Sequence, residues 1–160
     1  MLTRAELAAL LDRAFSDKPT AQPPLNFSDV PDTYWAADAI DRAVATGFMS
    51  GYPDNTFAPD RSVPRYEVLV AIATGLKLSP STTADATLQS FVDSGNMPAW
   101  SRSKVAATAE QGLIVNHPSR DQLRPNQAAT RAEIVAFLHQ ALVSQGKLPP
   151  VNSEFAVPAL

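Results

Sequence analysis

Apolar residues recur at every fourth position in three segments of the chain, each of which begins with an arginine two residues ahead of a glutamate. The segments start at Arg4, Arg65 and Arg131. Aligned on their glutamates, they carry the apolar sets Leu7, Leu11, Phe15; Val68, Ile72, Leu76; and Ile134, Leu138, Leu142. Spacing of this kind places the apolar side chains on one face of a helix. The pattern predicts three equivalent helices that pack face to face as a central bundle.

The stretches between these helices also repeat. An aromatic–x–Asp opening, a tryptophan and a glycine recur at offsets of 64 or 65 residues, as Phe27/Phe91, Trp35/Trp100 and Gly47/Gly112. Glycine just past a helix suits the left-handed backbone of a helix end. The pattern therefore predicts outer helices over residues 34–46 and 99–111.

This repeat organises the chain as one half-repeat and two whole ones. We expect a module over residues 1–146, made of a half-repeat at 3–16 and repeats at 27–78 and 91–143. Residues 17–26 and 79–90, rich in Pro, Ser and Thr, are expected to be connectors. Residues 147–160 are expected to form a C-terminal tail. The half-repeat has no upstream aromatic–Asp motif, so the chain reads as a fragment.

Composition narrows the function. The chain has 160 residues, no cysteine and a net charge of −3. It has no basic surplus of the kind that nucleic-acid binders carry, so we expect no nucleic-acid partner. No apolar run is long enough for a membrane span, and the first residues lack the pattern of a signal peptide. The two histidines, His117 and His139, have no catalytic or metal-ligating neighbours at suitable spacing. We expect no enzyme activity, cofactor or metal.

Several motifs together identify a resemblance. The loop Gly51-Tyr52-Pro53-Asp54-Asn55-Thr56-Phe57 is followed by Pro59, and Thr-Arg-Ala-Glu opens the first and third helices at Thr3 and Thr130. With the aromatic–x–Asp motif and the tryptophan, this sequence resembles the S-layer homology domain family. The resemblance implies an all-α, pseudo-threefold module around a central three-helix bundle. It also implies an exported protein of the cell envelope that binds an acidic, often pyruvylated, cell-wall or peptidoglycan-linked polysaccharide.

The arginine at each helix start is open to two interpretations. Thr and Glu of the Thr-Arg-Ala-Glu motif form a capping box, which needs no ligand. An arginine at the positive end of the helix dipole is unfavourable, so it is expected either to bind an anionic sugar or to pair with Asp29 or Asp93. Under the first interpretation, Arg65→Ala and Arg131→Ala weaken wall binding with little loss of stability.

Tryptophan and aspartate complete the expected site. Trp35 and Trp100 are candidates for flat platforms under sugar rings, with core packing as the alternative. Asp29 and Asp93 are expected to form turns or to orient an arginine. The full set of glycan-binding candidates is Arg4, Arg65, Arg131, Trp35, Trp100, Asp29, Asp93, Gly51 and Asp54. The second loop, 116–123, has lost the glycine and tyrosine of the first, and ordinary ligand binding is not expected there.

The missing outer part of the first repeat suggests a second kind of partner. We expect part of the helix at 3–16 to be uncovered, which would invite a protein partner or self-association. The alternative function is therefore a protein-interaction module in which the glycan grooves have decayed.

Overall fold

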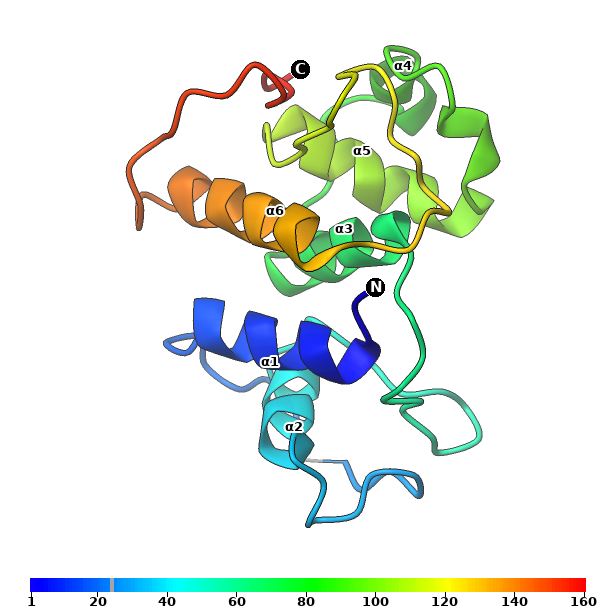
Figure 1. Ribbon diagram of the computed structural model, residues 1–160, viewed down its shortest axis with the longest axis vertical. Helices are drawn as coiled ribbons and strands as arrows, with labels where there is room; N and C mark the ends of the chain where they lie inside the picture. The colour runs from blue at the N-terminus through cyan, green and yellow to red at the C-terminus, as the bar shows by residue number, and fades with distance from the viewer. Residues whose placement is uncertain (24) are drawn as a thin grey trace.

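The computed structural model describes residues 1–23 and 25–160, and its regular structure in that range is helical (Figure 1). The elements are α1 (Arg4–Ala14), α2 (Ala37–Ala45), α3 (Arg65–Gly75), α4 (Ala84–Leu88), the 3-10 turns η1 (Ser94–Asn96) and η2 (Ala99–Ser101), α5 (Arg102–Glu110) and α6 (Arg131–Ser144). This confirms the all-α fold. None of these helices is long and apolar enough to cross a membrane.

Three equivalent residues mark the pseudo-threefold axis. The backbone N–H of Leu2 donates to the carbonyl of Ala129, that of Ala129 to Val63, and that of Val63 back to Leu2, at 2.9–3.0 Å. Each lies two residues before an inner helix, α1, α3 or α6, and at most 1% of its surface is exposed. The closed ring of hydrogen bonds joins the entrances of the three inner helices.

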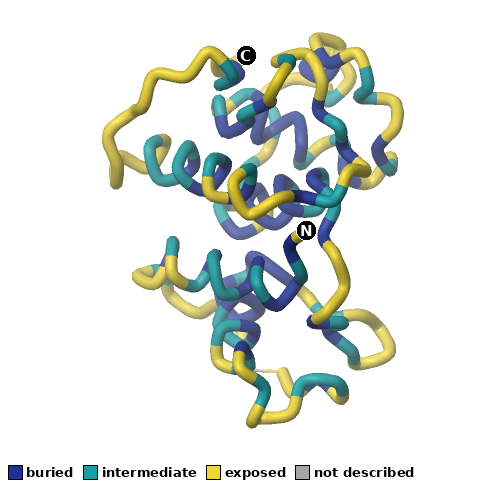
Figure 2. Tube along the Cα trace, viewed as in Figure 1, coloured by how far each residue is buried: buried dark blue, intermediate teal, exposed yellow. Residues whose placement is uncertain are grey.

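The apolar stripes of the inner helices enter one shared core. Leu7, Leu11, Val68, Ile72 and Ile134 are at most 1% exposed. Leu138 is also buried, whereas Leu76 and Leu142, at the far ends of their stripes, are only partly buried against this core. In Figure 2 the buried stretches run along α1, α3 and α5, and residues after α6 are mostly exposed. The expectation that Leu11, Ile72 and Leu138 share one core is confirmed.

The capping residues predicted from the sequence are found at the helix ends. Both expected capping boxes are present: the Thr3 and Thr130 hydroxyls accept from the Glu6 and Glu133 amides, and each glutamate accepts from the threonine amide. Gly47 and Gly112 have φ of +80° and +65°, as a left-handed helix end requires.

Two expected boundaries were wrong. The outer helix expected from residue 34 begins only at Ala37, because Tyr34 lies in the turns that precede α2, whereas the one expected from residue 99 begins there as η2 and continues as α5. The connector at 79–90 contains the short helix α4, which begins after Thr83, whose hydroxyl accepts from the Ala86 amide.

Residues 27–62 and 91–128, here called the outer halves, each pack an outer helix on the preceding inner helix. Thus α2 packs on α1, and α5 packs on α3 (Figure 1). The expectation of an uncovered helix at 3–16 was therefore wrong, since α2 covers it. Within the described residues, each of α1 and α3 is covered by the outer half that follows it in the chain, and no outer helix packs on α6.

The C-terminal tail runs back over the second outer half. Asn116 donates its backbone N–H to the Phe155 carbonyl, and Val157 donates to Ile114, both at 2.9 Å. The Phe155 ring meets His117 edge-on at 4.5 Å between centroids. Val157 is buried in the core. The part of the tail from Phe155 to Val157 is thus packed against the module.

Candidate functional site

Each outer loop is held by one aspartate. Asp29 accepts from the amides of Phe57 and Ala58 at 2.8 and 2.7 Å. Asp93 accepts from the amides of Leu123 and Arg124 at the same two distances. Ala58 and Arg124 both have positive φ, so the carboxylate fixes a turn with an unusual backbone. These aspartates act within the loops, and neither forms a hydrogen bond or ion pair with Arg4, Arg65 or Arg131.

Arg4, at the start of α1, inserts into the first loop. Its Nε donates to the Phe57 carbonyl at 2.7 Å and its Nη2 to the Ser50 carbonyl at 2.8 Å. The guanidinium also lies over the rings of Phe57 and Tyr52. Burial lowers the pKa of Arg4, and Tyr52 and Glu67 partly oppose that shift. The side chain thus anchors the loop to the inner helix.

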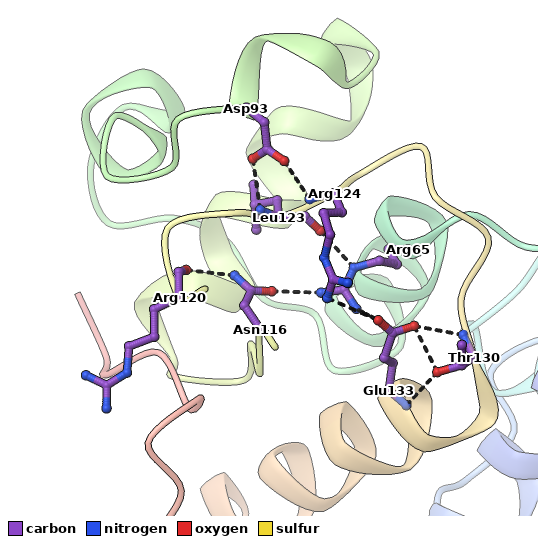
Figure 3. Close-up of polar contacts among 8 residues, drawn as sticks. All are labelled: Arg65, Asp93, Asn116, Arg120, Leu123, Arg124, Thr130 and Glu133. Carbon is purple, nitrogen blue, oxygen red and sulfur yellow. Dashed lines mark hydrogen bonds and ion pairs between the residues drawn. The ribbon is translucent and has the colours of Figure 1, made fainter. Parts of the chain in front are cut away.

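Arg65 anchors the second loop in the same way (Figure 3). Its side chain has no exposed surface. Its Nε donates to the Leu123 carbonyl at 2.8 Å and its Nη2 to Asn116 Oδ1 at 2.7 Å. Its Nη1 lies 2.6 Å from Glu133 Oε1, as an ion pair without the alignment of a hydrogen bond. Burial lowers the pKa of Arg65, and Glu133 opposes the shift. In this arrangement the guanidinium faces protein groups only.

Arg131 lies in a different environment. Its side chain is 66% exposed, and its Nη2 pairs with Glu6 Oε1 at 3.1 Å. Arg65 of α3 pairs with Glu133 of α6, and Arg131 of α6 pairs in the same way with Glu6 of α1, the next inner helix around the pseudo-threefold axis. Of the three helix-start arginines, Arg131 is thus the accessible one, because no outer half covers α6 within the described residues.

A cavity of about 420 Å³ opens between the two repeats. Its wall combines α1, the loop at 47–52, α3 and Trp100. The polar and aromatic side chains that line it include those of Arg4, Tyr52, Arg61, Glu67 and Trp100. Within it, Arg61 donates to the Tyr52 hydroxyl and to both carboxylate oxygens of Glu67.

The two tryptophans are equally exposed but differently placed. Trp35 and Trp100 are each 64% exposed, so core packing does not account for either side chain. Trp100 lines the cavity and meets Tyr66 edge-on at 5.8 Å. Trp35 packs beside Tyr34, at 5.9 Å between ring centroids, and does not line this cavity.

Comparison with known proteins agrees with this geometry. The model of the S-layer homology domain matches residues 26–68 and 90–135. The chain belongs to the S-layer homology domain family. The matched stretches contain both outer halves and the starts of α3 and α6.

The relatives of this S-layer homology module are much longer proteins, and each matches it over only part of its own length. Cell surface glycoprotein 1 of Acetivibrio thermocellus is 31% identical over 88% of this chain and 6% of its own length. The cellulosome-anchoring protein of the same organism is 29% identical over 96% of this chain and 34% of its own length. The S-layer protein of Bacillus licheniformis is 32% identical over 75% of this chain and 13% of its length. The chain thus spans at most about a third of these relatives.

Two further candidates in the first loop have local explanations. A Cβ on Gly51 would lie 2.1 Å from Cε1 of Phe27, so only glycine allows the loop to pack on that ring. Asp54 accepts from the amide and hydroxyl of Thr56 at 3.1 and 2.7 Å, which lowers the pKa of its carboxyl. Gly51 also lines the cavity, whereas Asp54 does not.

Sequence reasoning missed the cluster formed by Tyr52, Arg61 and Glu67. Arg61 stands six residues before Glu67, and a Pro at position 64 separates them, so helical periodicity does not relate the two. The signal that was available is the loop itself, because Tyr52 belongs to the Gly-Tyr-Pro-Asp motif. The described residues contain no cluster of three or more potential metal-ligating side chains.

Proposed function

We propose that this module attaches a protein to the cell envelope by binding an acidic wall polysaccharide in the cavity between its two repeats. The observation that carries the proposal is the joint presence of exposed Trp100 and the Tyr52–Arg61–Glu67 cluster on one concave wall. Aromatic faces pack against the C–H faces of sugars, and polar groups beside them fix the orientation of the ring.

Charge in the cavity suits an anionic polymer. Two guanidinium groups, of Arg4 and Arg61, line the wall together with one carboxylate, of Glu67. Arg61 remains 39% exposed at its side chain, so a sugar carboxylate can approach its guanidinium beside Glu67, which accepts from both terminal nitrogens. A pyruvyl substituent, which carries a carboxylate, is the group that the cationic wall and the partly exposed Arg61 fit best. The related S-layer and cellulosome-anchoring proteins named above support the envelope location.

This proposal leaves out some of the residues that the sequence suggested. Arg65 lacks exposed surface, and Asp29 and Asp93 are occupied by loop amides. Their part in binding is to hold the loops and inner helices in place. Arg4 contributes charge to the cavity wall while its Nε and Nη2 remain bound to loop carbonyls.

Sedimentation with purified cell walls tests the proposal. The protein should pellet with intact walls and stay in solution with walls stripped of their polysaccharide. Chemical removal of pyruvyl groups should weaken the pelleting, and Arg61→Ala should make the protein insensitive to that removal. Equal pelleting with intact and stripped walls would refute glycan binding.

A further inference from the structure

The tail packs on the second repeat as a short added strand. Residues 155–157 pair antiparallel with residues 114–116 through the two backbone hydrogen bonds described above. Beyond them, Ala159 lies against Gly112, where an added Cβ would be 3.3 Å from the Ala159 nitrogen. The tail thus follows residues 112–117 in the opposite chain direction.

The equivalent stretch of the first repeat, residues 47–52, borders open space. All of its residues line the cavity of about 420 Å³ between the repeats. A Cβ added to Gly47, the counterpart of Gly112, would meet no atom within 4 Å in the part of the chain that the structure describes. The first repeat therefore has a cavity at the place where the second repeat holds the tail.

The backbone groups that hold the tail have unpaired counterparts in the first repeat. The tail bonds to the Ile114 carbonyl and the Asn116 N–H, which correspond to the Met49 carbonyl and the Gly51 N–H. Within residues 1–23 and 25–160, these two groups of the first repeat have no backbone hydrogen-bond partner. They form a donor and an acceptor at the spacing that an added strand requires.

The residue between these two groups bonds elsewhere. The Ser50 carbonyl accepts from Arg4 Nη2 at 2.8 Å. Successive residues of an extended backbone direct their polar groups to opposite sides. The bond to Arg4 therefore leaves the Met49 and Gly51 groups on the side where a further segment can pair with them.

An aromatic side chain stands at the same place in both stretches. In the second repeat, the ring of His117 meets Phe155 of the tail. Its counterpart in the first repeat is Tyr52, which lines the cavity and is 37% exposed. Tyr52 thus offers an aromatic contact to an aromatic residue of a paired segment.

We propose that residues 49–51 bind an extended segment of a partner protein as an added strand. The segment has the aromatic–small–apolar pattern of Phe155-Ala156-Val157, because these are the residues that pair with the equivalent stretch of the second repeat. Backbone hydrogen bonds supply affinity in this mode of recognition, and alternate side chains supply specificity. The proposal does not depend on glycan binding, although the two ligands would occupy the same cavity.

Fluorescence anisotropy with a labelled peptide of residues 152–160, titrated with the full chain, tests the proposal. We expect saturable one-to-one binding. N-methylation of the peptide at Val157 should weaken binding about tenfold or more, because it removes the N–H that would bond to the Met49 carbonyl. N-methylation at Ala156 is the matched control and should have the smaller effect, since the Ala156 N–H faces its own Ser153 carbonyl in the docked tail.

Two equivalent substitutions distinguish the first repeat from exchange with the chain's own tail. Gly47→Asn should weaken peptide binding about tenfold or more, because its side chain enters the open path, while asparagine tolerates the positive φ. Gly112→Asn should have the smaller effect, and melting temperatures show that both variants fold. Peptide binding that Gly47→Asn leaves unchanged would overturn the proposal, whether or not Gly112→Asn weakens it. Absence of saturable binding, or equal losses from the two N-methylated peptides, would also overturn it.

Discussion

Arg65 of α3 and Glu133 of α6 form an ion pair with 2.6 Å between Nη1 and Oε1, and the guanidinium has no exposed surface. Glu133 also closes the capping box of α6 and pairs with Arg124. One carboxylate thus joins a helix start, an inner helix and the second loop. This relation explains why an arginine can stand at the positive end of a helix dipole, since the neighbouring glutamate and the loop carbonyls compensate for it.

Two arginines at equivalent positions should therefore respond differently to truncation. Arg65→Ala should lower the free energy of unfolding by about 3–5 kcal/mol, because it leaves the buried Leu123 carbonyl and Asn116 Oδ1 without their donor and removes one cationic partner of Glu133. Arg131→Ala should cost less than about 1 kcal/mol, because its ion pair is solvent-exposed. Urea denaturation of both variants measures this. The sequence alone predicted little loss for either, and equal, small losses would restore that view.

The loop aspartates should be structural. Asp29→Ala should destabilise the protein by about 1–3 kcal/mol, since the amides of Phe57 and Ala58 lose their acceptors. Asp54→Ala, in the same loop, serves as the control and should change stability little, because its carboxylate bonds only to nearby Thr56 in solvent. Thermal melts followed by circular dichroism compare the two. A larger loss in the Asp54 variant would contradict the assignment.

The inner stripes should be sensitive to loss of volume. Replacing Leu11, Ile72 or Leu138 with alanine should each cost about 2–5 kcal/mol, because each side chain lies in the shared core. Val135→Ala removes an apolar side chain of similar kind from an open position and should be nearly neutral. Chemical denaturation measures the free energy of unfolding of the core variants and of the Val135 variant. A core variant as stable as the Val135 variant would show that the three stripes do not share a core.

Glu110 should make stability depend on acid pH. The Ser81 amide, with hydroxyls of Thr87, Ser81 and Thr82, lowers the pKa of this carboxyl from 4.5 to about 2. Since the folded pKa lies below the unfolded one, its stabilising contribution is complete above about pH 4.5 and is lost as pH falls towards 2. Glu110→Gln should therefore lose less stability than the parent between pH 5 and about pH 2.5. Denaturant titrations at both pH values measure the difference, and equal losses would contradict it.

Much of the fold was predictable because its determinants are local. Spacing within each inner helix fixed the apolar face, and the Thr and Glu of each capping box fixed two helix starts. Gly47 and Gly112 marked helix ends because few other residues adopt positive φ. These signals lie within a few residues of each other and repeat along the chain.

Other features depended on contacts between distant segments. Identical Thr-Arg-Ala-Glu motifs at α1 and α6 place one arginine in a loop and leave the other exposed, and only the cyclic order of the outer halves decides which. Glu110 holds the connector at 81–87 from 23 or more residues away. Neither the placement of these arginines nor the contacts of Glu110 leave a periodic pattern in the sequence. The binding candidates therefore included residues, such as Arg65, that the structure buries.

The two tryptophans provide the most direct test of the glycan-binding account. Trp35 and Trp100 are equivalent in the repeat and equally exposed, but only Trp100 lines the cavity between the repeats. The affinity of each alanine variant for purified wall polysaccharide can be measured by isothermal titration calorimetry. Trp100→Ala should weaken binding about tenfold or more, and Trp35→Ala should leave it within about twofold of the parent. If Trp35→Ala weakens binding and Trp100→Ala does not, the cavity between the repeats is not the glycan site.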